Sequence, residues 1–101
     1  MIHFIATYKV KEEKLEEVKN AIPDFVTAVR DNEPTTLYYS SYQKKEEPLS
    51  FVHLMSFENE DAKRFHENAE YTKKFMEFLC PECENPPEYI ELQMIKCNKN
   101  L

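Results

Sequence analysis

Apolar residues along this chain recur with two different periods. A period of two residues is typical of a β-strand, and a period near 3.6 is typical of an amphipathic helix. Four segments have the two-residue period or the aromatic and β-branched residues that strands favour, namely 2–10, 37–42, 50–57 and 88–96. Two segments have the helical period, namely 12–30 and 59–79. The expected order is therefore strand, helix, strand, strand, helix, strand.

The first predicted helix carries one apolar stripe along its length. The stripe consists of Leu15, Val18, Ile22, Phe25, Val26 and Val29. Pro23 lies inside the same segment, and proline removes a backbone donor from the helical ladder. We therefore expect Pro23 to kink this helix or to split it in two.

The second predicted helix follows Asn59, whose side chain can cap the first turn. Its apolar stripe consists of Ala62, Phe65, Ala69, Thr72, Met76 and Leu79. His66 lies four residues after Ala62 and therefore falls on the edge of this stripe. We expect one continuous helix that turns His66 toward the interior.

The order of elements predicts an α+β domain of the ferredoxin-like type, βαββαβ. In this fold a four-stranded antiparallel sheet has both helices on one face. The chain of 101 residues has no segment that resembles a linker, so residues 1–101 are expected to form a single domain. Since the uncovered face of the sheet also carries apolar residues, we expect a homodimer formed by sheet-to-sheet packing.

Charge and composition exclude several classes of function. The formal net charge is −6 and the basic residues are scattered, so nucleic acid and membrane surfaces are not expected partners. The chain has no glycine, which excludes the P-loop and the dinucleotide-binding loop. Its first residues are too polar for a signal peptide, and no apolar run approaches the roughly 20 residues of a membrane span. We expect a cytoplasmic protein.

The three cysteines raise the question of a metal or redox site. An odd count in a chain of this kind favours free thiols over disulfides. Cys80 and Cys83 form a CxxC motif, but the motif follows a helix C-terminus, where the helix dipole opposes a thiolate. Structural zinc needs four ligands, and Cys97 is the only obvious third one. No metal is expected, and the role of the cysteines stays open.

Several short motifs occur in a fixed order from Ile2 to about Ile95. They are Tyr8-Lys9-Val10, Glu33-Pro34, Phe51-Val52-His53-Leu54, Phe57-Glu58-Asn59-Glu60-Asp61-Ala62 and Phe65-His66. In this order and spacing the chain resembles the antibiotic biosynthesis monooxygenase-like dimeric α/β barrels, a family that includes quinol monooxygenases.

The resemblance implies a homodimer with a pocket between the sheet and the helices of each subunit. Family enzymes oxidise phenolic or quinol substrates with molecular oxygen and without metal or flavin, so no cofactor is implied. Triplet oxygen reacts slowly with closed-shell molecules, and the substrate must therefore become an electron-rich anion. The protein supplies a dry aromatic pocket, a base and hydrogen-bond donors. The expected function is cofactor-independent oxidation of a small phenolic, quinol or other aromatic compound.

His66 is the predicted catalytic residue, because it matches a histidine that is common after the acidic cap in this family. An imidazole, with a reference pKa of about 6.5, can take a phenolic proton at neutral pH. His53 joins His66 in the pocket if its strand face meets the helices, and it is an interface residue if that face meets the partner chain. The predicted substrate-binding residues are Tyr39, His53, Met55, Phe57, Phe65, Tyr71 and Phe75.

A non-catalytic function is the alternative. A dimeric protein of this fold could sequester or sense a small ligand, for instance in a stress response. Many family members have a glutamate at the position of Met55 and a tryptophan at the position of Phe57, and both differences favour this alternative. Haem breakdown is disfavoured, because the haem-degrading branch uses a tryptophan and a first-strand asparagine that this chain lacks.

Overall fold

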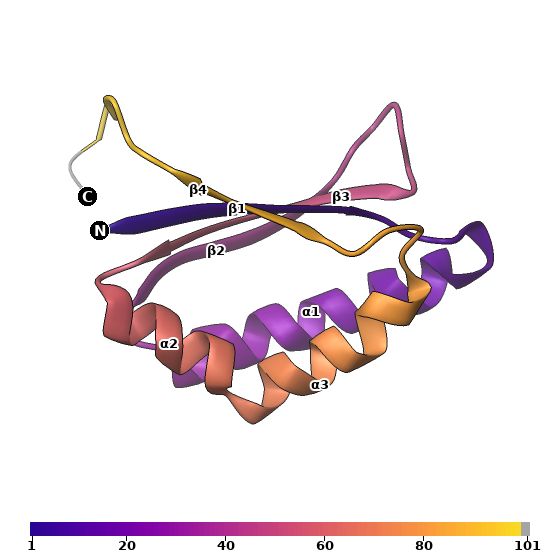
Figure 1. The fold of residues 1–101 in the computed structure, drawn as a ribbon, viewed down its shortest axis with the longest axis horizontal. Helices are drawn as coiled ribbons and strands as arrows, with labels where there is room; N and C mark the ends of the chain where they lie inside the picture. Colours follow the sequence, from indigo (N-terminus) through magenta and orange to yellow (C-terminus); the bar gives the residue numbers. More distant parts are fainter. Residues whose placement is uncertain (100–101) are drawn as a thin grey trace.

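One antiparallel sheet forms one layer of the molecule, and the helices lie together on one face of it (Figure 1). The computed structural model describes residues 1–99. The strands are β1 (Ile2–Lys9), β2 (Thr36–Gln43), β3 (Ser50–Phe57) and β4 (Glu88–Leu92). They are hydrogen-bonded in the order β2-β3-β1-β4, with all pairs antiparallel. The ferredoxin-like α+β fold is therefore confirmed.

The last strand is shorter than the predicted segment 88–96. Leu92, its final residue, pairs with His3 near the start of β1. Beyond that point β1 offers almost no further backbone to pair with, so the ladder ends. Residues 93–96 continue without strand structure.

The first helical segment begins with a short 3₁₀ turn, η1 (Glu12–Lys14), and continues as α1 (Leu15–Asn32). Of the two effects expected of Pro23, a kink or a split, the split does not occur, because α1 runs without interruption through this residue. Pro23 is exposed, so water can reach the carbonyl that loses its helical partner. Buried residues on both sides of the proline pack both halves of the helix into the core; they are Val18, Ile22, Phe25 and Val29.

The second helical segment was predicted to form one continuous helix, but it forms two. It divides at Ala69 into α2 (Glu60–Asn68) and α3 (Glu70–Leu79), followed by the short turn η2 (Cys80–Glu82). The buried residues are Ala62 and His66 in α2, and Thr72, Phe75 and Leu79 in α3. In one continuous helix, at about 100° per residue, these two groups would point roughly 125° apart. The extended backbone of Ala69 (φ −62°, ψ 141°) lets both groups face the sheet.

With the break, His66 faces the interior as predicted, but Phe65 does not. His66, expected at the margin of the stripe, is only 6% exposed, whereas Phe65, expected within the stripe, is 57% exposed. The predicted cap of this segment is confirmed, because the Asn59 side chain accepts a hydrogen bond of 2.9 Å from the backbone N–H of Ala62.

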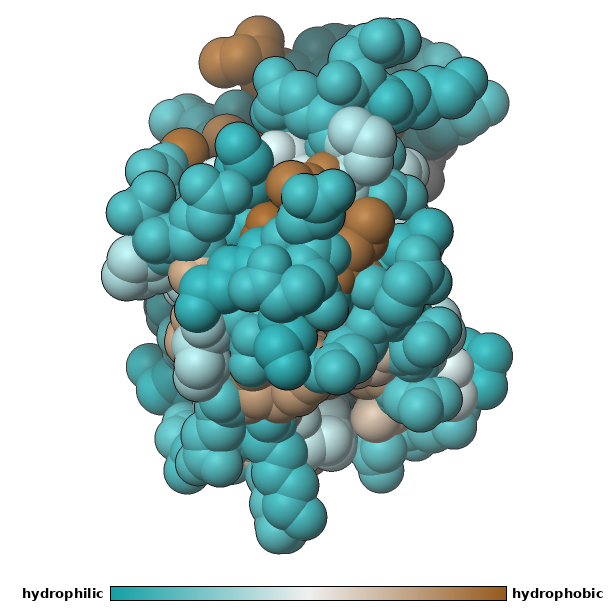
Figure 2. Space-filling model, turned by 90° about the vertical axis from the view of Figure 1, so that its right-hand side faces the viewer, coloured by the Kyte–Doolittle hydropathy of each residue, from teal (hydrophilic) through white to brown (hydrophobic). Residues whose placement is uncertain are grey.

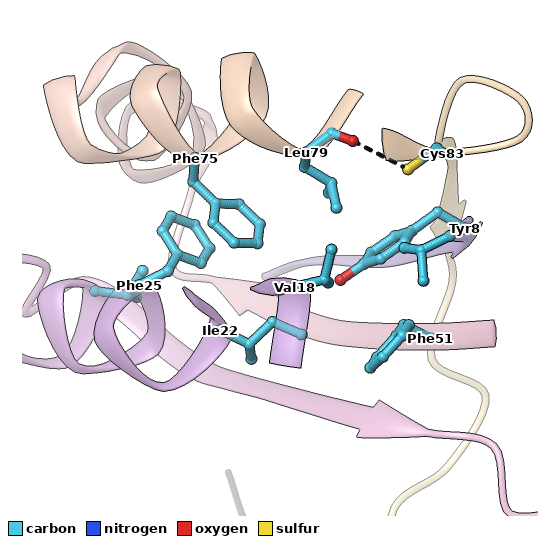
Figure 3. Close-up of a cluster of buried hydrophobic side chains, with 10 residues drawn as sticks. Tyr8, Val18, Ile22, Phe25, Phe51, Phe75, Leu79 and Cys83 are labelled. Atoms are coloured by element: carbon cyan, nitrogen blue, oxygen red, sulfur yellow. Dashed lines mark hydrogen bonds between the residues drawn. The ribbon is translucent and has the colours of Figure 1, made fainter. Parts of the chain in front are cut away.

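The main core lies between β1, β3, α1 and α3 (Figure 3). Phe25 of α1 and Phe75 of α3 stack with their ring centroids 4.3 Å apart. Tyr8 of β1 stacks on Phe51 of β3 at 5.5 Å. A smaller apolar cluster lies at the other end of the sheet, around Phe57. The two clusters do not fill the whole interior, and a cavity lined by residues of both lies between the sheet and the helices.

The outer surface at the end of the molecule shown in Figure 2 is mostly hydrophilic, with hydrophobic atoms visible in gaps between the polar ones and at the upper left edge. None of the helices within residues 1–99 combines the length and the apolar character that crossing a membrane requires.

Candidate functional site

A cavity of about 390 Å³ lies between the sheet and the helices. Its floor comes from alternate residues of β1 and β3, because successive strand residues point to opposite faces. Its roof comes from α1, α2 and α3, and Pro87 and Tyr89 line it at the edge strand β4. Most of the lining side chains are aromatic or aliphatic, as in typical small-molecule pockets.

Six of the eight predicted site residues line this cavity. They are Tyr39, His53, Met55, Phe57, His66 and Phe75. The question that the sequence left open for His53 is therefore resolved, since its strand face meets the helices. Phe65 and Tyr71 do not line the cavity: the first points outward from α2, and the second bonds to Glu33 behind the wall.

His66 is held by a buried carboxylate. Its Nδ1 lies 2.9 Å from Oε2 and 3.0 Å from Oε1 of Glu33, and both residues are almost completely buried. Glu33 follows the end of α1, and His66 lies in the last turn of α2. The two helices thus bring together residues that are 33 positions apart in the chain.

Glu33 is stabilised as a carboxylate by three donors. Besides His66, the hydroxyl of Thr36 donates to Oε1 at 2.6 Å, and the hydroxyl of Tyr71 donates to Oε2. Burial by itself raises the pKa of Glu33, but the hydrogen bonds from His66, Thr36 and Tyr71 outweigh that effect and lower it below its ordinary value. Glu33 is therefore ionised at neutral pH and can only accept hydrogen bonds.

This pairing fixes the proton on the His66 ring. Since the carboxylate only accepts, Nδ1 carries the hydrogen, and in the neutral ring Nε2 carries the lone pair. Within residues 1–99, no side chain or backbone group is hydrogen-bonded to Nε2. His66 lines the cavity, and its ring contacts Phe57 and Tyr39 with centroid distances of 5.3 and 5.5 Å. Nε2 is thus the unpaired nitrogen of a ring that lies in an aromatic environment.

His53 forms a second polar group on the floor of the cavity, and its partners are all hydroxyls. Tyr8 lies 2.7 Å from Nε2 and Ser41 lies 3.1 Å from it, while Tyr39 lies 2.8 Å from Nδ1. Burial, together with the nearby His66, lowers the pKa of His53 to about 4. His53 is therefore neutral at pH 7, and it links two tyrosines rather than forming an ion pair.

The tyrosines of this network remain protonated. Burial raises the pKa of Tyr39 well above its ordinary value, and burial likewise raises the pKa of Tyr8. A phenol that keeps its proton can donate a hydrogen bond to an anion in the cavity. Tyr39 is suited to this role because it contacts both histidine rings and lines the cavity itself.

Among residues 1–99, the Lys and Glu side chains that line the cavity are Lys63 and Glu67, and both belong to α2. Nζ of Lys63 lies 3.6 Å from Glu67 and 5.1 Å from the centre of the Phe4 ring. Tyr89 of β4 donates to the sulfur of Met76 at 3.3 Å. The interior wall around His66 is thus largely apolar.

Glu33 is the site residue that sequence reasoning missed, although it was noted within a family motif. Acidic residues are mostly exposed, so composition gives no reason to place one in the interior. A signal was nevertheless present, because Glu33 lies four residues after Val29 and continues the buried stripe of α1.

The cysteines contribute nothing to this cavity. Cys80 is exposed, whereas Cys83 is buried and donates to the carbonyl of Leu79 at 3.4 Å (Figure 3). Burial raises the pKa of Cys83 to about 11. In the part of the chain that the structure describes, no group of three or more His, Cys, Asp or Glu side chains is arranged to hold a metal ion.

Comparison with known proteins gives matches in family and in fold. The model of the family described as antibiotic biosynthesis monooxygenase matches residues 1–77. A protein from Caulobacter crescentus, named provisionally as an antibiotic biosynthesis monooxygenase, is 26% identical with a TM-score of 0.86, over 94% of this chain and 90% of that one. No curated protein matches the sequence.

Two further solved structures share the fold at lower identity. A structure of an antibiotic biosynthesis monooxygenase is 19% identical with a TM-score of 0.88, over 95% of this chain and 100% of that one. A conserved protein from Methanosarcina mazei is 22% identical with a TM-score of 0.83, over 91% and 90% of the two chains.

Proposed function

Because the chain belongs to the antibiotic biosynthesis monooxygenase family, we propose that it oxidises a small phenol or quinol with molecular oxygen and without a resident cofactor. The observation that carries this proposal is the free Nε2 of His66 in an aromatic cavity, with its ring held by the buried carboxylate of Glu33. A base of this kind is what such a reaction needs from the protein.

The first step is removal of the phenolic proton. Nε2 of His66 accepts this proton, and the carboxylate of Glu33 stabilises the imidazolium that results. When Nδ1–H of His53 donates to the Tyr39 oxygen, the Tyr39 hydroxyl keeps its own hydrogen and can donate it to the phenolate oxygen. The charge of the phenolate spreads over its ring carbons and makes them electron-rich.

The second step is the reaction of a ring carbon with oxygen. One oxygen atom forms a bond to the carbon, and the other leaves as water. The substrate supplies all four electrons, so that a phenol becomes a quinone (C₆H₆O + O₂ → C₆H₄O₂ + H₂O). The O–O bond and the C–H bond of that ring carbon break; the proton from the carbon and the proton held by His66 enter the water, and the base is regenerated. No external reductant is needed.

The test is oxygen uptake by the purified protein with a panel of hydroquinones. We expect uptake above the buffer rate, and His66→Ala should lower the rate by on the order of a hundredfold or more. Glu33→Gln keeps the shape but removes the charge, and it should lower the rate by about 10- to 100-fold.

The matched control is Glu46→Gln, the same substitution in the exposed connection between β2 and β3. It should leave the rate unchanged. If wild type and His66→Ala both consume oxygen no faster than buffer, the enzymatic proposal is wrong.

A binding function without chemistry is the second candidate. The cavity wall beside His66 presents Met55 and Phe57, and neither side chain adds a polar group that could steer a reaction. A protein of this kind would bind the same aromatic compounds without consuming oxygen. Saturable binding of a hydroquinone, with oxygen uptake at the buffer rate, would identify this function.

The proposal includes a homodimer formed through the open face of the sheet. Large apolar side chains on this face are substantially exposed; they are Tyr38, Tyr42, Ile90 and Leu92. Ile5 and Leu54 lie between them on the same face and are partly buried. An apolar surface of this kind is typical of a contact between protein subunits, and sheet-to-sheet packing of a second copy would cover it.

A further inference from the structure

Besides Nε2 of His66, the hydroxyl of Thr72 in the cavity wall has no hydrogen-bond partner within residues 1–99. Thr72 lines the cavity from α3 and is only 7% exposed. Its hydroxyl oxygen is buried and has no hydrogen-bond partner among residues 1–99. An unpaired buried hydroxyl destabilises a folded protein, and such groups are rare in native structures.

Thr72 and the proposed base, His66, line the same cavity from neighbouring helix ends. His66 lies in the last turn of α2 and Thr72 in the first turn of α3, on the two sides of the break at Ala69. Both side chains are buried and both line the same cavity. A threonine in a helix occupies two rotamers, so its hydroxyl can turn toward a bound molecule.

Apart from Nε2 of His66, the polar groups of His53 and Tyr39 on the inner walls already have hydrogen-bond partners. Each nitrogen of His53 has a hydroxyl partner, and Tyr39 is bonded to His53. Thr72 therefore differs from them, because its hydroxyl has no hydrogen-bond partner in the ligand-free protein.

We infer that Thr72 determines ligand specificity by forming a hydrogen bond with a second oxygen of the bound aromatic compound. This inference rests on one part of the proposed function, namely that the first oxygen of the ligand binds at Nε2 of His66. The ligand class is an aromatic ring with two oxygen substituents. A simple phenol satisfies His66 but leaves the Thr72 hydroxyl unpaired.

The experiment measures binding without oxygen, so that oxidation does not interfere. Phenol, catechol, resorcinol and hydroquinone are titrated into the wild-type protein and into Thr72→Val by anaerobic calorimetry. We expect at least one of the three dihydroxybenzenes to bind wild type about tenfold more tightly than phenol. Thr72→Val, which replaces the hydroxyl by a methyl group, should remove this advantage and leave phenol binding unchanged.

Thr72→Ser is the matched control, because it keeps the hydroxyl and should keep the advantage. His66→Ala should weaken the binding of phenol and the dihydroxybenzenes alike. If no dihydroxybenzene binds more tightly than phenol, or if Thr72→Val retains the advantage, Thr72 has no role in specificity.

The stability of the ligand-free protein gives a second measurement. Since Thr72→Val removes an unpaired hydroxyl, its midpoint of denaturant unfolding should equal or exceed that of wild type. A lower midpoint would show that the hydroxyl is already paired in the free protein, and it would overturn the inference. Failure of oxygen uptake would contradict the proposed function but not the role of Thr72, which the binding ratios test separately.

Discussion

One glutamate and two histidines are buried among residues 1–99, and each is accommodated differently. Glu33 keeps its charge because three donors surround the carboxylate. His53 is neutral and bonds only to hydroxyls. His66 is fixed by Glu33 at one nitrogen and leaves the other free toward the cavity. Buried polar groups that lack partners are costly, so this pairing is a condition for placing a base inside the fold.

His53 makes the stability of the protein dependent on pH. Its pKa is about 4 in the folded state and 6.5 in the reference state, so below pH 6.5 the unfolded chain binds a proton that the folded chain does not. The contribution of His53 to the free energy of unfolding is therefore fully present above pH 6.5, and it decreases as the pH falls toward 4. The expected loss in the free energy of unfolding is on the order of 3 kcal/mol.

The check is urea unfolding of wild type and His53→Gln at pH 7 and at pH 4. Glutamine does not titrate, so the difference in stability between the two proteins should narrow at pH 4. A difference that stays constant or widens would contradict this explanation of the His53 environment.

At the scale of elements, the break at Ala69 decides which side chains form the site. The predicted single helix places Phe65 inside and His66 at the margin, whereas the divided segment buries His66 and exposes Phe65. Ala69 is the N-cap of α3, but alanine has no side-chain acceptor for the free backbone donors of the first turn.

Ala69→Ser should therefore stabilise the protein. The serine hydroxyl can accept from a backbone N–H in the first turn of α3, and the expected gain in the free energy of unfolding is about 1 kcal/mol. Denaturant unfolding measures this gain.

Asn59→Ala is the converse change, because it removes the cap that α2 already has, and it should lower stability by about the same amount. Asn20→Ala, an exposed position within α1, should change stability very little. If Ala69→Ser is no more stable than wild type, the backbone at Ala69 does not act as a cap.

At the scale of the whole molecule, the two faces of the sheet have different roles. One face and the helices enclose the cavity, and the other face carries exposed apolar side chains. The cavity lies within one chain, so the proposed dimer would cover the open face without being needed to form the cavity wall.

Leu54→Glu should separate the proposed dimer into monomers, because it places charges near the centre of the sheet-to-sheet contact. Sedimentation velocity should show wild type as a dimer and the variant as a folded monomer. Thr27→Glu, on the exposed side of α1, is the control and should remain dimeric. A wild-type protein that sediments as a monomer at micromolar concentration would contradict the dimer.

The sequence by itself determined the order of the elements, the ferredoxin-like fold and the family, because these follow from the periodicity of apolar residues and from local motifs. It also indicated His66, through its place after the Asn59 cap. Only the tertiary structure decided that β3 turns His53 toward the helices, that Glu33 holds His66, and that Thr72 is left unpaired. These features depend on contacts between residues far apart in the chain. They also depend on the helix break at Ala69, which turns the buried residues of α2 and α3 to the same side, and neither can be read from a local sequence pattern.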